Sequence, residues 1–69
     1  MIITNKQKEE LKSILTEKEF EKLMALSTDI SDFEDELDHL IVTRLDKELN
    51  PTEDYRKLQV LYEEIYNQN

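Results

Sequence analysis

The part of this sequence richest in reactive side chains is acidic. Six carboxylates fall within ten residues: Asp29, Asp32, Glu34, Asp35, Glu36 and Asp38. Carboxylates at this density can hold a cation, act as paired acids and bases, or form a negative surface that attracts a basic partner. Asp and Glu are also favoured at the start of a helix, where the helix dipole is positive. Two interpretations therefore stand: a solvated helix start, and a docking surface for a basic protein.

Two metal-binding patterns begin in this segment, and neither is complete. Asp29 and Ser31 would be the first and third ligands of a calcium loop, but Phe33 stands at the fifth position and the turn glycine is absent. Glu36 and His39 have the Glu-x-x-His spacing of di-iron bundles, which need two such motifs and two further Glu. With one His and no Cys in the chain, we predict no metal and no cofactor.

The sequence does not indicate catalytic machinery. His39 has no set of nucleophile and acid around it, and a chain without Gly cannot form a glycine-rich phosphate loop. A chain of 69 residues also makes at most one small domain, which barely encloses a cleft. We therefore predict that the protein is not an enzyme.

Four helices are expected to position these residues. Gly is absent and Pro occurs once, while Glu, Leu and Lys are abundant, which favours an all-α chain. Each expected start has a capping residue with Glu or Gln three positions later. These pairs are Thr4 with Gln7, Thr16 with Glu19, Ser31 with Glu34, and Asn50 with Glu53, the last with Pro51 in the first helical position. The predicted helices span 5–14, 17–27, 32–49 and 51–67.

The apolar pattern predicts how these helices pack. The helix over 32–49 has an apolar arc too broad for one neighbour, so we predict that it is central and forms an antiparallel hairpin with 51–67. The short helices 5–14 and 17–27 pack across this hairpin. The fold class is all-α, a small bundle of three to four helices in a single domain over 1–69. The predicted apolar faces comprise Leu11, Ile14, Leu15, Phe20, Leu23, Met24, Leu26, Phe33, Leu37, Leu40, Ile41, Val42, Leu45, Leu49, Tyr55, Leu58, Leu61, Tyr62, Ile65 and Tyr66.

Four further residues are candidates for contact with another protein. Arg44 falls in the apolar stripe of the third predicted helix, where it either pairs with Glu48 one turn ahead or meets another chain. Tyr55, Tyr62 and Tyr66 share one stripe of the fourth predicted helix, as a core edge or an aromatic anchor. The predicted partner-binding residues are Asp29, Asp32, Asp35, Glu36, Asp38, Arg44, Tyr55, Tyr62 and Tyr66.

The charge of the protein lies in its second part. Residues 1–27 carry five Lys and five Glu, whereas residues 28–69 carry four basic and twelve acidic residues and hence the whole net charge of −8. Such a surface repels nucleic acid and acidic membranes and attracts basic proteins. No apolar run approaches the roughly 18 residues of a membrane span, and residues 1–12 do not resemble a signal peptide. We therefore expect a cytoplasmic protein.

Three short stretches resemble a known family. In order along the chain, residues 15–20 (LTEKEF), 34–40 (EDELDHL) and 50–51 (NP) are similar to the first two helices of the nuclease-bacteriocin immunity proteins. The resemblance covers roughly half of the chain and implies a small acidic four-helix protein that covers a toxin nuclease. The family's short tyrosine-pair motif is missing, because residues 55–58 continue a long helix, and no binding residue is carried over.

Three hypotheses for function follow. The first is a non-enzymatic interaction module that binds a basic protein surface, an inhibitor or regulator of phage or mobile-element type. The second is a nucleic-acid mimic or immunity-type inhibitor of a nucleic-acid enzyme, whose carboxylates imitate phosphates. The third is a self-assembling unit that buries the excess apolar arc of its third helix in a homodimer. Direct binding of nucleic acid is disfavoured, because no predicted helix carries a basic face.

Overall fold

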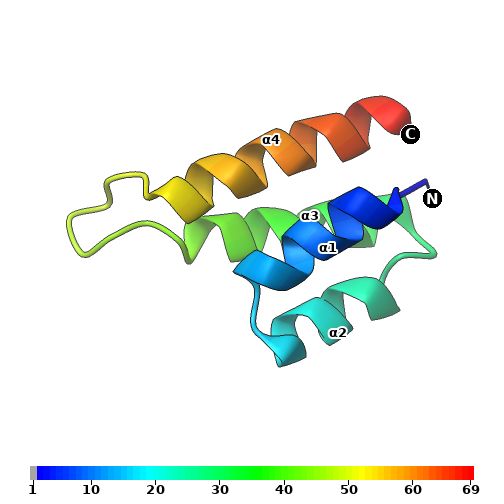
Figure 1. The fold of residues 1–69 in the computed structure, drawn as a ribbon, viewed down its shortest axis with the longest axis horizontal. Helices are drawn as coiled ribbons and strands as arrows, with labels where there is room; N and C mark the ends of the chain where they lie inside the picture. Colours follow the sequence, from blue (N-terminus) through cyan, green and yellow to red (C-terminus); the bar gives the residue numbers. More distant parts are fainter. Residues whose placement is uncertain (1) are drawn as a thin grey trace.

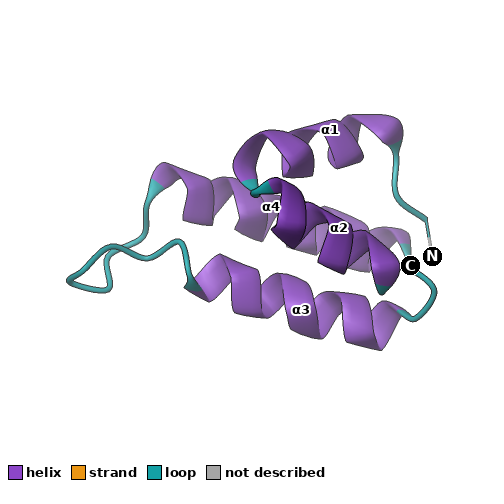
Figure 2. Ribbon diagram, turned by 90° about the horizontal axis from the view of Figure 1, so that it is seen from below, coloured by secondary structure: helices purple, strands orange, loops and turns teal. Residues whose placement is uncertain are grey.

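Four α-helices form the computed structural model, which describes residues 2–69. They are α1 (Asn5–Ile14), α2 (Glu17–Ala25), α3 (Ile30–Val42) and α4 (Glu53–Gln68). Successive helices run in opposite directions, and α3 and α4 lie side by side (Figure 1 and Figure 2). Each helix packs against two others: α3 against α4 and α2, and α1 against α4 and α2. The prediction of an all-α fold is confirmed.

The first two helices begin where the sequence predicted. The Thr4 hydroxyl accepts the N–H of Gln7 at 3.1 Å, and the Gln7 side chain accepts the N–H of Thr4 at 3.0 Å. Thr16 and Glu19 make the same reciprocal pair at 3.2 and 2.9 Å. Both predicted capping boxes are therefore confirmed, although α2 ends at Ala25, two residues before its predicted end.

The third and fourth helices begin at other caps than those predicted. Asp29, not Ser31, caps α3, and its carboxylate accepts the N–H of Ser31 at 2.9 Å. Thr52, not Asn50, caps α4, and its hydroxyl accepts the N–H of Tyr55 at 3.1 Å. The predictions were wrong by two positions in each case, because Ser, Thr, Asn and Asp all make good caps and stand close together in these turns.

The prediction that the third helix continues to residue 49 is also wrong. α3 ends at Val42, and a loop over 43–52 leads to α4. Val42 and Leu49, which the sequence pattern placed in the apolar arc, are 56% and 74% exposed. The predicted arc was too broad because Leu49 lies in the loop and Val42, the last residue of α3, points to solvent, so α3 itself has a narrower apolar face.

Hydrogen bonds within this loop explain why the helix stops. The Asp46 carboxylate accepts the N–H groups of Glu48 and Asn50 at 2.9 and 2.8 Å, and the Asp46 N–H donates to the Asn50 carbonyl at 3.0 Å. Asp side chains that bond nearby backbone donors favour turns over helix. Leu49 takes a left-handed conformation with a φ of 64° inside this turn.

One apolar core lies between the four helices. Its buried members are Leu11, Leu15, Leu23, Phe33, Leu37, Leu40, Ile41, Leu58, Leu61 and Ile65, all of them predicted from the periodic pattern. Tyr55 and Tyr62 are partly buried against this cluster, at its edge. Within residues 2–69, every helix is too short or too polar to cross a membrane.

A polar contact joins α1 to the last turn of α4. Gln7 is only 5% exposed, and its Nε2 donates to Oε1 of Gln68 at 2.7 Å while Gln68 Nε2 donates back to Gln7 Oε1 at 3.0 Å. Next to this pair, the Ile2 N–H donates to Oδ1 of Asn69 at 2.7 Å. The buried amide of Gln7 is thereby satisfied, as buried polar groups generally are.

Replacing Leu49 with Gly should stabilise the protein. A side chain with a Cβ is unfavourable by about 1 kcal/mol in the left-handed region, and this exposed Leu contributes little burial. We expect Leu49→Gly to raise the free energy of unfolding, measured in urea, by about 0.5–1 kcal/mol. Leu49→Ala keeps the Cβ and is the control, with no gain expected. An equal gain in both variants would contradict an origin in the backbone conformation.

Candidate functional site

The acidic segment is divided between two flanks of α3. Asp29 uses its carboxylate to cap the helix, so for this residue the structure supports the interpretation as a helix start. Glu36 is turned toward α2, where its Oε1 lies 3.7 Å from Nζ of Lys22 and its side chain is 17% exposed. Asp32, one turn before Glu36 on the same flank, is exposed.

Three carboxylates of α3 act electrostatically on Tyr62 of α4, where the two helices meet. The two helices are antiparallel, so the start of α3 lies beside the end of α4 (Figure 1). Burial, followed by the negative charges of Glu34, Asp38 and Asp35, raises the pKa of the Tyr62 hydroxyl above its usual value. Tyr66, one turn further along, is 58% exposed and also acts on Tyr62. We call these five residues the acidic tyrosine seam.

The seam presents negative charge and an aromatic ring, two features that attract cations. Among residues 2–69, no Lys, Arg or His lies within ion-pair distance of Glu34, Asp35 or Asp38. The exposed ring of Tyr66 lies on the same seam. Carboxylates accept the fork of an Arg side chain, and an aromatic face attracts its positive charge.

Sequence reasoning missed Glu34, which it assigned to a capping box with Ser31. The spacing could have grouped Glu34 with Asp38, because residues four positions apart share a flank of a helix. The sequence alone did not show which flank of the helix would face the tyrosines.

Tyr55 lies outside the seam. It precedes Tyr62 by two turns of α4, about 10 Å along the helix axis. Its ring is partly buried against the core, and its hydroxyl accepts a hydrogen bond from Nε2 of Gln59 at 3.1 Å. The predicted stripe of three tyrosines is thus divided: Tyr55 and Tyr62 form an edge of the core, and Tyr66 is the exposed member.

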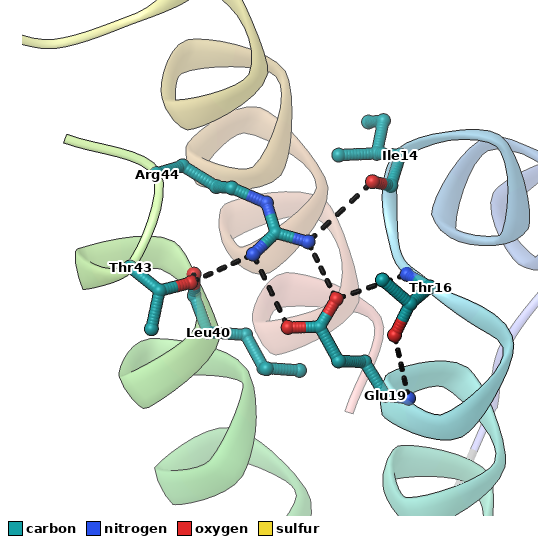
Figure 3. A network of polar contacts seen from close by, with 6 residues as sticks. All are labelled: Ile14, Thr16, Glu19, Leu40, Thr43 and Arg44. Atoms are coloured by element: carbon teal, nitrogen blue, oxygen red, sulfur yellow. Dashed lines mark hydrogen bonds and ion pairs between the residues drawn. The ribbon is translucent and has the colours of Figure 1, made fainter. Parts of the chain in front are cut away.

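Arg44 is held inside the protein by a double hydrogen bond. It lies in the turn after α3, and its Nη2 and Nη1 donate to the two carboxylate oxygens of Glu19 at 2.6 and 3.2 Å (Figure 3). It also donates to the Thr43 hydroxyl at 2.8 Å and to the Ile14 carbonyl at 3.5 Å. The predicted ion pair at the core edge is confirmed, but Glu48 was the wrong partner because the helix ends before it.

Glu19 bonds both Arg44, in the turn after α3, and the N-terminal cap of α2. Its Oε1 bonds Arg44 and also accepts the N–H of Thr16 at 2.9 Å, which completes the cap of α2. The hydrogen bonds from Arg44, with smaller contributions from Thr16, outweigh burial and lower the pKa of Glu19 from 4.5 to about 2. The same hydrogen bonds raise the pKa of Arg44. The side chains of Glu19 and Arg44 are 24% and 18% exposed, so the pair is largely shielded from water.

Known proteins give no guide to the function of this site. No protein-family model, curated protein or solved structure matches this chain. The partial resemblance to the immunity proteins is therefore not supported by a match to a family model. Across residues 2–69, His, Cys, Asp and Glu side chains do not gather in groups of three or more that could hold a metal ion.

Replacing Glu19 with Gln should remove an acid-sensitive part of the stability. Because the folded pKa lies below the unfolded value of 4.5, the stabilisation is complete above that pH and disappears as the pH falls through about 2. We expect Glu19→Gln to lower the free energy of unfolding at neutral pH by about 1.5–3 kcal/mol.

The measurement is urea unfolding of wild type and variant at a series of pH values. The difference between the two proteins should shrink below pH 4.5 and vanish near pH 2. Glu17→Gln changes an exposed carboxylate in the same helical turn and should alter stability by less than about 0.5 kcal/mol. A constant difference between Glu19→Gln and wild type at every pH would contradict the assigned ion pair.

Proposed function

We propose that this protein is a non-enzymatic interaction module, an inhibitor or regulator, that binds a basic protein surface through the acidic tyrosine seam. The observations that support this proposal are that Glu34, Asp35 and Asp38 have no ion-pair partner among residues 2–69 and act on Tyr62 across the contact between α3 and α4. The exposed Tyr66 lies one turn further along α4. In this proposal α3 and α4 act as the antiparallel hairpin that presents the seam, and α1 and α2 pack across its other side.

The distribution of charge favours a basic partner. Residues 28–69 carry the whole net charge of −8, and both helices of the seam belong to this part. A negative surface speeds encounter with positive proteins and disfavours nucleic acid and acidic membranes. Arg side chains suit the seam best, because one guanidinium can pair with a carboxylate and stack on a tyrosine ring.

The seam is also ordered before any partner binds. Tyr62 packs against the core, and Glu34 is partly buried on the helix beside it. Side chains that are already held in place lose little conformational freedom on binding, which favours affinity. Asp35, Asp38 and Tyr66 remain exposed for contact.

Neutralising the seam should strongly weaken binding without unfolding the protein. The variant Glu34→Gln, Asp35→Asn, Asp38→Asn removes three charges that no Lys or Arg among residues 2–69 compensates. Wild type and variant would serve as baits in a bacterial lysate, and the affinity of each captured protein would then be measured by calorimetry. We expect the variant to bind about tenfold more weakly or worse, and Tyr66→Ala to weaken binding as well.

The matched control changes three exposed carboxylates outside the seam and outside the predicted partner-binding residues: Glu9→Gln, Glu21→Gln and Glu48→Gln. It alters the net charge equally and should retain the partner. Equal losses in both variants would show that only net charge matters, and binding that survives in the seam variant would refute the proposal. Displacement of the partner by DNA would support the alternative of a nucleic-acid mimic.

A further inference from the structure

A second surface lies on the flank of α4 that faces α1. An open groove of about 480 Å³ runs between these two helices. Its lining comprises Glu10, Ser13, Ile14, Arg56, Lys57 and Val60. Val60 stands near the middle of α4 and is 55% exposed, although it is apolar. A single exposed Val is ordinary on a protein surface. The charged residues around Val60 indicate what kind of molecule could bind there.

Charged residues lie at equal distances on either side of Val60 along α4, and the two sides carry opposite signs. Arg56 and Lys57 lie one turn before it, and Glu63 and Glu64 lie one turn after it. All four side chains are exposed, and the spacing of three and four residues keeps them on the outer side of the helix near Val60. Reversing the direction of α4 about Val60 exchanges Arg56 with Glu64 and Lys57 with Glu63. The helix is therefore complementary in charge to an antiparallel copy of itself.

We propose that this surface binds a second copy of the chain, with the two α4 helices antiparallel and crossing at Val60. Arg56 and Lys57 of each copy then meet Glu64 and Glu63 of the other, so every ion pair occurs twice about one twofold axis. The two Val60 side chains meet at the axis, beside the partly buried Ile14 of each groove. Such an isologous contact closes on itself and gives a dimer, not a filament.

Charge complementarity distinguishes this occupant from others. A basic partner would meet Arg56 and Lys57, and nucleic acid would meet Glu63 and Glu64, so each would find like charge over half of the surface. A parallel pair of α4 helices would also place like charges opposite each other. Of these occupants, the reversed copy pairs all four charges, and Lys57 then exchanges its exposed pair with Glu53 of the same helix for Glu63 of the other copy. The net charge of −8 on each copy opposes association at longer range, so a weak, reversible dimer is expected.

This dimer does not depend on the proposed function. The groove beside Val60 lies between α1 and α4, whereas the acidic tyrosine seam lies where α3 and α4 meet. Both seams therefore remain free when two copies associate. A dimer would carry two equivalent seams, which raises avidity for a partner with repeated basic sites.

Sedimentation equilibrium of the whole chain, up to about 1 mM protein, tests the proposal. We expect wild type to form dimers, and Arg56→Glu with Lys57→Glu to weaken dimerisation about tenfold or more. Adding Glu63→Lys and Glu64→Lys to that variant restores the original net charge and the antiparallel complementarity, so dimerisation should return. Lys18→Glu with Lys47→Glu makes the same change in net charge at exposed positions elsewhere and should leave the dimer within about threefold of wild type.

The outcomes decide between the alternatives. A wild-type protein that stays monomeric up to about 1 mM would overturn the proposal and leave the groove to another kind of molecule. A dimer that Arg56→Glu with Lys57→Glu does not weaken would show that it uses a different surface. Circular dichroism establishes that each variant is folded, and failure of the folded fourfold variant to recover dimerisation would exclude the antiparallel register.

Discussion

The bidentate pair between Arg44 and Glu19 is the contact on which the arrangement of the four helices depends. The Arg44 side chain bonds Glu19 at the start of α2 and the Ile14 carbonyl at the end of α1. Its backbone carbonyl accepts the hydroxyl of Thr52, the residue that caps α4, and it lies in the turn that ends α3. One residue therefore connects the ends of all four helices.

This pair matters because the apolar core is small. Ten buried side chains supply the core, and domains of this size usually retain only about 3–5 kcal/mol of net stability. A shielded, doubly hydrogen-bonded ion pair contributes a large part of such a margin, whereas an exposed pair such as Lys57 with Glu53 contributes little. The Gln7–Gln68 pair secures the opposite end of the molecule by hydrogen bonds between neutral groups.

Only some local features of this protein were predictable from its sequence, and the long-range polar contacts were not. The cap pairs at Thr4 and Thr16 and all ten buried residues follow from spacing within a few residues. The end of α3 was missed because the turn bonds of Asp46 overrode a periodic apolar pattern. Glu19 and Arg44 stand 25 positions apart, and no local pattern relates them.

In the candidate site, too, the local patterns were visible in the sequence and the long-range contact was not. The acidic density and the tyrosine spacing are visible in the sequence, but their meeting depends on which flank of α3 faces α4. That flank is set by the packing of Phe33, Leu37, Leu40 and Ile41 against the residues of α4. Five of the six carboxylates were therefore assigned from the sequence to one contact surface, whereas the structure divides them between two flanks of α3.

The contact between Gln7 and Gln68 has a kinetic consequence. These residues stand 61 positions apart, so their pairing closes a long loop and is disfavoured until the other helices are in place. α1 itself buries only Gln7 and Leu11 within its span, whereas α3 and α4 supply seven of the ten core residues. The protein should therefore open from α1 inward, with amide hydrogens in α1 exchanging with solvent well before those in α3 and α4.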